Sequence, residues 1–338
     1  MKALFIDAPG QIEIRETPDP KPLPGQALIE VSRCGLCGSD ISAYRGGNAT
    51  IEYPILIGHE VVGVIREIED GHDLKKGDRV VVEPFTFCGD CLMCGIGRYN
   101  NCSKLKTRGC QIPGTMSTLI THDIRQLFKI PDSLSDTDAA MVEPLTIALN
   151  ALHRAGVKSG DMALITGAGT IGLLAALSCM AYGATPMLVE PVERRLDIAR
   201  KLGIRHVLNS SGDADIVEFL REHTNGYLAN VIIECSGAGS VLEKLTDYAG
   251  FGGRIVFVGW PKAPVSFNTF WFLRKELDLF GSRNSCNCFP EAIESIATGK
   301  IDASSLITEI ISLEDTPRFV PIIAQHPEKY LKVIVDLT

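Results

Sequence analysis

The hydrophobic pattern of this chain changes near residue 134. Up to about Val82, short apolar or alternating runs are separated by Pro, Gly and Asp, which predicts a series of short strands. Because no helical run interrupts them, this part is predicted to be a small all-β barrel or sandwich. From about Leu134, apolar residues recur at helical intervals, with Ser135 and Asp136 as expected N-terminal caps. The pattern therefore predicts a β-rich part followed by a part that contains helices.

Beyond residue 160, buried-type strands alternate with helices. The first strand is Met162–Thr166, and later runs read Pro-Met-Leu-Val-Glu, Asn-Val-Ile-Ile-Glu and Arg-Ile-Val-Phe-Val. Such alternation predicts an α/β fold with a parallel, doubly wound sheet. Past about Ser285 the pattern predicts a helix, a turn and a closing strand. Because 338 residues exceed what one hydrophobic core usually supports, two domains are expected.

A glycine motif follows the strand Met162–Thr166. Gly167 is expected to make the tight turn, Gly169 to let the backbone approach a pyrophosphate, and Gly172 to allow close packing of helix on strand. The next residues of the motif, Thr170 and Ile171, open a helix whose free N–H groups suit phosphate oxygens. Strand, glycines and helix together predict a dinucleotide site.

Glu190 ends the strand after that helix, where an acidic side chain can bind the adenosine ribose hydroxyls. Its charge would repel the extra phosphate of NADP, so NAD is favoured over NADP. Arg194 and Arg195 follow closely and keep NADP open as an alternative. Further cofactor contacts are expected where later strands end, at Cys235, Val258, Ser282 and Arg283.

A second set of residues suggests a metal. Cys37, His59 and Glu60 offer a thiolate, an imidazole and a carboxylate, which suits an open catalytic zinc better than a closed structural one. The pair Cys34 and Cys37 alone would be weak support, since Cys-x2-Cys also occurs in redox and structural sites.

Glu143 is a further acidic candidate. It falls in an otherwise apolar helical run, where a carboxylate needs a partner that a nearby zinc would supply. The alternative is a solvated glutamate on a helix face. Pro144 beside it predicts a break in the helical hydrogen bonding.

Four cysteines lie close together in the pattern Cys-x2-Cys-x2-Cys-x7-Cys, namely Cys88, Cys91, Cys94 and Cys102. Four thiolates in a glycine-rich loop can enclose one tetrahedral ion and leave no open position, so a structural zinc is predicted. An iron–sulfur cluster is the alternative, although the x7 spacing fits ferredoxin patterns poorly. Cys110 lies just outside and is interpreted as a spare thiol.

These motifs, Cys-Gly-Leu-Cys-Gly-Ser-Asp, Gly-His-Glu, Glu-Pro-Leu and Gly-Asp-Arg-Val, resemble the zinc-dependent medium-chain dehydrogenase/reductases in order and rough spacing. The chain looks most like the sorbitol, galactitol-phosphate and galactonate dehydrogenase branch. The resemblance implies catalytic zinc at Cys37 and His59, with Glu60 and Glu143 competing for the remaining protein ligand. It also implies a GroES-like catalytic domain over 1–148 with a structural zinc lobe at about 84–105, a Rossmann domain over 149–284, and a return to the first domain over 285–338. A homodimer or homotetramer is expected.

The proton relay departs from this family. Ser39, two residues after Cys37, is placed to accept the alcohol proton, but Ser42 stands where the family carries a relay histidine. Serine cannot store a proton near neutral pH, so the relay must end elsewhere. A sensing or regulatory protein that binds NAD and zinc with little turnover therefore stays open as an alternative.

Substrate residues are expected after the first ligand motif and after a strand of the cofactor domain. The candidates are Tyr44, Arg45, Asn48, Arg283 and Asn284. Two arginines could hold a carboxylate or phosphate, which suggests a sugar acid or sugar phosphate as readily as a neutral polyol. Either arginine could instead be a surface or interface residue.

Charge limits the choice of partner. The net charge of −8 argues against a protein that binds nucleic acid, and therefore against a nucleic-acid-binding zinc ribbon formed by the four cysteines. It also argues against a protein that binds an anionic membrane. A small-molecule substrate is expected. No signal peptide or apolar run long enough to span a bilayer is visible, and eleven cysteines are an odd number, so a cytoplasmic protein with reduced thiols is predicted.

Overall fold

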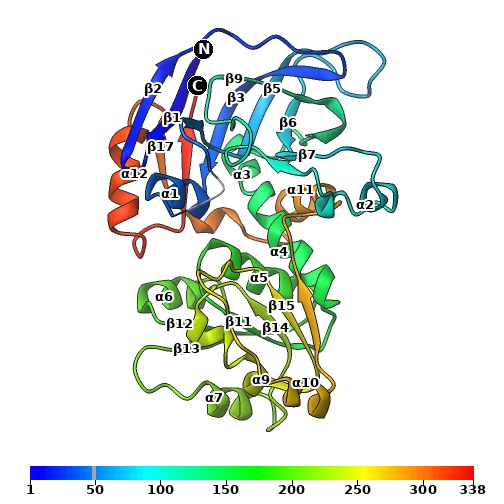
Figure 1. Ribbon diagram of the computed structural model, residues 1–338, viewed down its shortest axis with the longest axis vertical. Helices are drawn as coiled ribbons and strands as arrows, with labels where there is room; N and C mark the ends of the chain where they lie inside the picture. Colours follow the sequence, from blue (N-terminus) through cyan, green and yellow to red (C-terminus); the bar gives the residue numbers. More distant parts are fainter. Residues whose placement is uncertain (48–50) are drawn as a thin grey trace. The chain divides into compact units, whose positions relative to one another are not determined.

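The computed structural model describes residues 1–47 and 51–338. The chain divides into two compact units. Unit 1 comprises Met1–Glu143, Phe289–Gly299 and Ala303–Thr338, and unit 2 comprises Pro144–Cys288 and Lys300–Asp302. The end of the chain thus belongs to the same unit as its beginning (Figure 1). Asn48, one of the expected substrate residues, lies outside the described residues.

Unit 1 is built on β-sheets. Within the described residues, its larger sheet has seven strands in the order β10-β6-β5-β3-β18-β17, with β9 also paired to β3, and a smaller sheet has the order β2-β1-β4. The strands are β1 (Lys2–Ala8), β2 (Gln11–Glu16), β3 (Gln26–Leu36), β4 (Ile55–Leu56), β5 (Glu60–Glu67), β6 (Arg79–Val82), β9 (Leu119–Asp123), β10 (Leu127–Lys129), β17 (Ile307–Ser312) and β18 (Lys332–Asp336). Apolar side chains from both sheets form one core, which confirms the predicted β-rich part.

Strand register brings distant residues together at one end of β3. Gly35 pairs with Glu60 of β5, while Leu36 pairs with Val333 of β18. A Cβ atom on Gly35 would lie 2.0 Å from Glu60 Oε2, so only glycine leaves room for that carboxylate. The register therefore places Glu60 beside the first residues of the closing strand.

A small lobe projects from unit 1 and carries the four clustered cysteines. It contains the strand pair β7 (Phe85–Thr86) and β8 (Lys106–Thr107), the short helix α2 (Leu92–Gly95) and the 3-10 turn η1 (Tyr99–Asn101). Tyr99 stacks on Phe87 and donates a hydrogen bond of 2.8 Å to the buried carboxylate of Glu83, which precedes β7 in the chain. These contacts attach the lobe to the sheet.

The helical run after residue 134 contains a break, but not at Pro144. Helix α3 (Asp136–Ala139) begins after Ser135, whose side chain accepts a hydrogen bond from Asp138 N as expected for a cap, and α4 (Val142–Ala155) begins three residues later. Pro144 falls in the first turn of α4, where the backbone N–H has no partner within the helix, so the proline interrupts nothing.

Unit 2 contains a parallel, doubly wound sheet, which confirms the predicted α/β class. In the described part of the chain its strand order is β13-β12-β11-β14-β15-β16. The strands are β11 (Met162–Thr166), β12 (Thr185–Glu190), β13 (His206–Asn209), β14 (Ala229–Glu234), β15 (Ala249–Phe257) and β16 (Asp278–Gly281). The accompanying helices are α5 (Thr170–Ala181), α6 (Glu193–Lys201), α7 (Ile216–His223), α8 (Gly239–Leu242), α9 (Leu245–Tyr248) and α10 (Thr269–Lys275).

The final segment contains more helices and strands than predicted. Besides the expected helix α11 (Phe289–Ala297) and the closing strand β18, it holds the 3-10 turn η3 (Ser304–Leu306), β17 and helix α12 (Thr316–Gln325). The prediction of only a helix, a turn and a strand was therefore incomplete. β17 pairs in parallel with β18.

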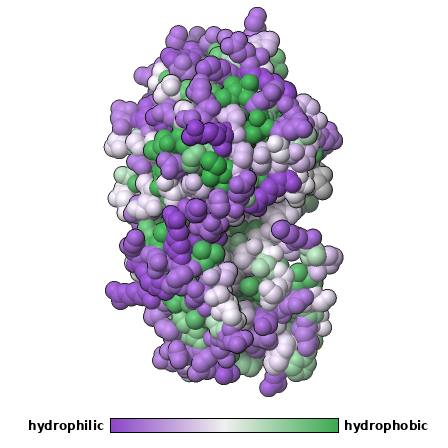
Figure 2. Space-filling model, turned by 90° about the vertical axis from the view of Figure 1, so that its left-hand side faces the viewer, coloured by the Kyte–Doolittle hydropathy of each residue, from purple (hydrophilic) through white to green (hydrophobic). Residues whose placement is uncertain are grey.

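Among the described residues, none of the helices has the length and apolarity needed to traverse a bilayer. The face drawn in Figure 2 is mainly hydrophilic, with hydrophobic residues in separate patches. Scattered apolar groups of this kind are normal on a protein surface.

Candidate active site

Cys37, His59 and Glu60 come together in unit 1. One ligand atom from each residue lies within 4.8 Å of those of the other two. Cys37 caps the short helix α1 (Gly38–Tyr44) directly after β3, and Glu60 is the first residue of β5. His59 and Glu60 are buried, while Cys37 is part-exposed. The predicted mixture of sulfur, imidazole and carboxylate is thus present at one point.

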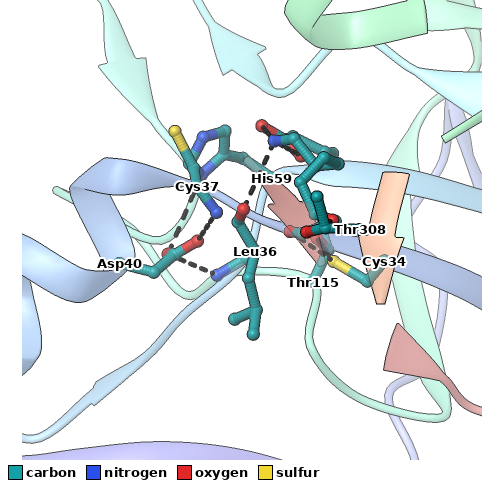
Figure 3. Close-up of polar contacts among 11 residues, drawn as sticks. Cys34, Leu36, Cys37, Asp40, His59, Thr115 and Thr308 are labelled. Atoms are coloured by element: carbon teal, nitrogen blue, oxygen red, sulfur yellow. Dashed lines mark hydrogen bonds and ion pairs between the residues drawn. The ribbon is translucent and has the colours of Figure 1, made fainter. Parts of the chain in front are cut away.

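Asp40, which the sequence did not single out, organises this cluster. Its carboxylate accepts hydrogen bonds from Cys37 N at 2.9 Å and from Gly58 N at 3.2 Å (Figure 3). It thereby joins the segment that carries Cys37 to the one that carries His59. Asp40 is only 1% exposed, and burial raises the pKa of its carboxyl. The signal was available, because an acidic residue three positions after a helix cap forms a capping box.

His59 lies between the sulfur of Cys37 and the carboxylate of Asp40. Burial lowers the pKa of the imidazole, but the nearby Cys37, Asp40 and Glu143 together raise it well above its ordinary value. Its Nδ1 lies 4.0 Å from Asp40 Oδ1 and has no hydrogen-bond partner among the described residues. Several anionic groups thus converge on this imidazole, an arrangement that suits a bound cation.

Glu60 forms a buried ion pair with Lys332 of β18. Lys332 Nζ contacts both carboxylate oxygens and lies 3.3 Å from the carbonyl oxygen of Leu36. The two side chains are 1% and 3% exposed. Sequence reasoning missed Lys332, although a lysine in an otherwise apolar strand was a visible signal. Its charge offsets that of Glu60.

Glu143 is the second carboxylate near His59. It lies in the first turn of α4 and is 6% exposed. Burial raises the pKa of Glu143 to about 7, while the charge of His59 acts in the opposite direction. Its oxygens are outside the group formed by Cys37, His59 and Glu60.

Cys110, which was interpreted as a spare thiol, is influenced by the charges of this cluster. The chain after it is fixed to the segment before His59, since Gly114 N donates to Leu56 O at 2.7 Å and Thr115 N to Gly58 O at 3.0 Å. Burial raises the pKa of Cys110 to about 11, and the charges of the cluster also act on it. The thiol is therefore protonated at neutral pH.

The four clustered cysteines have the spacing of a tetrahedral site. Their sulfur atoms all lie within 4.8 Å of one another. The separations are 3.5 Å for Cys91–Cys94, 3.5 Å for Cys88–Cys102 and 3.9 Å for Cys88–Cys94. A tetrahedron with metal–sulfur bonds of about 2.3 Å has edges of about 3.8 Å. The sulfur positions therefore fit a single ion.

The glycine motif has the conformation expected of a nucleotide-binding turn. Gly169 caps α5, and a Cβ atom on it would meet no other atom within 4 Å. A Cβ atom on Gly172 would lie 1.9 Å from Gly167 O, so only glycine permits this contact between helix and turn. Thr170 and Ile171 form the first turn of α5, whose N–H groups suit an anion.

Glu190 lies beside this turn at the end of β12. It is buried and accepts hydrogen bonds from Ala168 N at 2.6 Å and Val192 N at 3.1 Å. Arg195 Nη1 is 3.6 Å from the same carboxylate. The arginine thus lies next to the acidic residue.

Cys235, Val258 and Ser282 each follow directly after a strand, β14, β15 and β16 respectively. These strands are neighbours in the sheet and parallel to β11, so the three residues share an edge with the glycine turn. Arg283 is exposed in the same loop. The fully buried Glu234, which was not predicted, shapes this edge by accepting hydrogen bonds from Ser236 N and Gly237 N, each at 2.8 Å.

The expected substrate residues that the structure describes belong to both units, Tyr44 and Arg45 to unit 1 and Arg283 and Asn284 to unit 2. Tyr44 packs against the core of unit 1. Arg45, at the end of α1, donates to the carbonyl of Ala324 at the end of α12. Asn284 has a left-handed backbone with φ 50° in unit 2. Ser39 is part-buried in the first turn of α1, two residues from Cys37.

Similar sequences support the same assignment. Residues 23–132 match the alcohol dehydrogenase GroES-like domain, and residues 170–298 match the zinc-binding dehydrogenase family. An uncharacterized zinc-type alcohol dehydrogenase-like protein of Haemophilus influenzae is 44% identical over 98% of both chains. Sorbitol dehydrogenase of Bacillus subtilis is 33% identical over 99% of this chain and 97% of its own. A 2-dehydro-3-deoxy-L-galactonate 5-dehydrogenase of Pseudoalteromonas atlantica is 34% identical, with coverage of 87% and 86%.

Solved structures share the whole fold. A short chain alcohol dehydrogenase from Escherichia coli, complexed with NADH, has a TM-score of 0.94 at 30% identity and covers 100% of this chain and 99% of its own. A zinc-binding dehydrogenase from Sinorhizobium meliloti bound to NADP has a TM-score of 0.91 at 29% identity, with 99% of each chain covered. Both cofactors thus occur among the structural neighbours.

Proposed function

Because this chain belongs to the zinc-dependent medium-chain dehydrogenase/reductase family, we propose that it oxidises a secondary alcohol of a polyol, sugar acid or sugar phosphate and transfers the hydride to NAD. The family membership makes it a zinc-dependent alcohol dehydrogenase. The observation that carries the proposal is the cluster of Cys37 and His59 with two nearby carboxylates, one of them neutralised by a buried lysine.

The donor set suits a catalytic zinc. Cys37 and His59 supply two ligands, and the buried imidazole is surrounded by groups that favour a cation. Of the two carboxylates, Glu60 is engaged by Lys332 through both oxygens. We therefore assign Glu143 as the remaining protein ligand and Glu60 as the supporting carboxylate behind the site. When bound, zinc is a Lewis acid that polarises an alcohol oxygen and favours loss of its proton.

The four-cysteine lobe is proposed to hold a structural zinc. Sulfur separations of 3.5–3.9 Å support one tetrahedral ion, because an iron–sulfur cluster holds its cysteine sulfurs farther apart. The backbone N–H of Cys94 lowers the pKa of the Cys91 thiol, which favours the thiolate form that binds a metal ion.

NAD is proposed as the cofactor, with the pyrophosphate at the glycine turn and the adenosine ribose at Glu190. The carboxylate of Glu190 is held in place by two backbone N–H groups, and Arg195 lies close to it. An arginine that faces a carboxylate is less available to a 2′-phosphate, which supports NAD over NADP. Cys235, Val258, Ser282 and Arg283 are proposed to contact the nicotinamide half.

Ser39 is proposed to accept the alcohol proton and pass it to solvent. It is part-buried in the first turn of α1, two residues from Cys37. Ser42 lies one turn further along α1 and carries no group that titrates near neutral pH. The Ser39→Ala variant should lose turnover while it keeps its metal content, with Ser42→Ala as the matched control.

The substrate class rests on the motifs and on the relatives. Sorbitol and a deoxygalactonate are the substrates named for two proteins that are 33% and 34% identical. The proposed candidates for contacts with the polar groups of a related substrate are Arg283 and Asn284 in unit 2, and Tyr44 and Arg45 in unit 1. Hydroxyl and carboxylate recognition by such donors is chemically suitable.

A substrate scan tests this function. Zinc-loaded protein is mixed with NAD and with polyols, aldonates, sugar phosphates and simple primary alcohols, and NADH is followed by absorbance. Oxidation of a polyol or sugar derivative supports the proposal. Oxidation of simple primary alcohols alone would refute the substrate class, and NAD binding without turnover of any alcohol would favour a sensing role.

A homodimer is proposed to form along β16. In the described residues this strand is the last of its sheet, so one row of its backbone groups has no neighbouring strand. Exposed apolar side chains lie on it and on the preceding helix α10, with Leu279 of β16 40% exposed and Phe270 and Leu273 of α10 55% and 86% exposed. Light scattering of the Leu273→Glu variant tests the assignment, since a shift towards monomer is expected, and an unchanged oligomeric state would place the interface elsewhere.

A further inference from the structure

Two of the cysteines outside both predicted metal clusters lie close to each other in the chain. Cys286 and Cys288 are separated by Asn287 in the segment that leads from β16 to α11. Cys286 is part-exposed, whereas Cys288 is fully buried. The pair therefore combines a thiol that solvent reaches with one that is protected.

The backbone brings the two cysteines within the range of a disulfide. Asn287 has φ 57°, in the left-handed helical region. Helical dihedrals of either hand place the Cα atoms of residues two apart roughly 5.4 Å from each other, from a radius of about 2.3 Å and a rise of about 1.5 Å. Disulfides span Cα separations of about 4.4–6.8 Å. A left-handed helical conformation at Asn287 is therefore compatible with a disulfide between its two neighbours.

The buried sulfur of Cys288 is turned towards the backbone of Cys286. Cys288 Sγ lies 3.2 Å from the carbonyl oxygen of Cys286, so the buried sulfur folds back over the preceding cysteine. On its other side Cys288 Sγ is 3.8 Å from His153 Nδ1. The imidazole is in turn 3.1 Å from the hydroxyl of Tyr182 through Nε2. A proton acceptor therefore adjoins the buried thiol.

We propose that Cys286 and Cys288 form a reversible disulfide when the protein meets a peroxide. The thiolate of Cys286 attacks a peroxide oxygen and becomes a sulfenic acid, while the other oxygen leaves as an alcohol or water. Cys288 then gives its proton to His153, and its thiolate attacks the sulfenic sulfur and releases water. Two thiols and one peroxide thus yield one disulfide, one alcohol or water from the peroxide, and one further water. His153 returns its proton to solvent.

Peptide mapping tests the disulfide directly. Trypsin releases residues 284–300 as a peptide that contains Cys286 and Cys288 and no other cysteine. Zinc- and NAD-loaded protein is treated with hydrogen peroxide, its remaining thiols are blocked with N-ethylmaleimide, and the tryptic peptides are analysed by mass spectrometry. The peptide is expected to lose two hydrogen atoms and to regain them on reduction with dithiothreitol. A peptide that keeps both thiols, or that forms a disulfide with another cysteine of the chain, overturns the proposal.

The chain offers a matched internal control. Residues 34–45 form a tryptic peptide that also holds two cysteines, Cys34 and Cys37, and it is expected to stay reduced. Cys34 is fully buried and Cys37 belongs to the metal cluster. Oxidation of this peptide at the same or a lower peroxide concentration would show that peroxide does not oxidise Cys286 and Cys288 selectively.

Two variants establish the order of the steps. Cys288→Ser should accumulate a sulfenic acid at Cys286 that dimedone traps, because the resolving thiol is missing. Cys286→Ser should leave Cys288 reduced, since that thiol is buried. The reverse pattern would contradict the assignment of Cys286 as the attacking thiol. Phenylarsine oxide binds paired thiols, so it should label the 284–300 segment of the unmodified protein but of neither variant.

Discussion

Lys332 is paired with Glu60 in the interior of unit 1, 272 residues apart in sequence and next to the Cys37–His59 cluster. Lys332 is 3% and Glu60 1% exposed, so both charges are removed from water. Burial lowers the pKa of Lys332, but the charges of Glu60 and Cys37 raise it above its ordinary value. Lys332 therefore stays protonated at neutral pH, and its positive charge lies beside the metal site.

Removal of Lys332 should strongly destabilise the protein. The Lys332→Met variant leaves the Glu60 carboxylate buried without its partner, which typically costs about 3–5 kcal/mol. The free energy of unfolding, measured by urea denaturation of zinc-loaded protein at neutral pH, should fall by this amount. The double variant Lys332→Met/Glu60→Gln should recover much of the loss, because no buried charge remains.

An exposed ion pair on the neighbouring strands supplies the control. Arg66 of β5 pairs with Glu30 of β3, with side chains 49% and 46% exposed. The Arg66→Met variant should cost less than about 1 kcal/mol, since solvent screens such pairs. Equal losses in the Lys332 and Arg66 variants would contradict the special role of the buried pair.

The two cysteine clusters should lose metal independently. Cys37→Ser should bind about one zinc fewer per chain and lose turnover, because its thiolate is a proposed catalytic ligand. Cys102→Ser should also bind about one zinc fewer, but with a clear drop in melting temperature, because a structural ion supports its fold. Zinc content by mass spectrometry, melting temperature and alcohol-dependent NADH formation distinguish the two. A Cys102→Ser protein that lacks the metal yet melts like the wild type would contradict the structural assignment.

Local motifs allowed much of the fold to be predicted from the sequence. The glycine turn, the strand before it and the acid after it act within one βαβ unit, so their spacing alone predicted the dinucleotide site. Helix α12 was missed because Pro317 and Pro321 lie within it and hide its pattern. Pro317 falls in the first turn, where a proline is tolerated, but Pro321 is internal.

The candidate site was predictable only where its residues are close in sequence. Cys37, His59 and Glu60 come from a short stretch and were named together. Lys332 joins them through the pairing of β18 with β3, which the sequence does not show. The choice between Glu60 and Glu143 depended on that long-range contact and therefore stayed open.

Cofactor preference should depend on the charge of Glu190. Glu190→Gln keeps an oxygen that can accept the hydrogen bond from Ala168 N but removes the repulsion of a 2′-phosphate. The ratio of kcat/KM for NADP to that for NAD should rise about tenfold, equivalent to about 1.4 kcal/mol. Initial rates with both cofactors measure it, with Glu193→Gln on the adjacent exposed helix turn as control. An unchanged ratio would remove Glu190 from cofactor selection.

The stability of the protein should fall between acidic and neutral pH because of Glu83. Burial raises the pKa of this carboxyl to about 7, while the hydrogen bond from Tyr99 opposes the shift. In the unfolded chain its pKa is about 4.3. The folded protein therefore holds a proton that the unfolded chain has lost over this interval. Stability consequently decreases as the pH rises from about 4.3 to about 7 and does not decrease further through this group.

Glu83→Gln should remove this part of the pH dependence, because an amide cannot ionise. The difference of roughly 2.7 pKa units corresponds to at most about 3–4 kcal/mol. The free energy of unfolding is measured by urea denaturation at pH 5 and pH 8 for zinc-loaded wild type and variant. The wild type should lose more stability than Glu83→Gln between these values, whereas Glu67→Gln, an exposed change on β5, should behave like the wild type. The other titrating groups are common to all three proteins, so their contributions cancel when the pH profiles of stability are compared. Parallel profiles for the wild type and Glu83→Gln would mean that Glu83 is already ionised in the folded protein at pH 5.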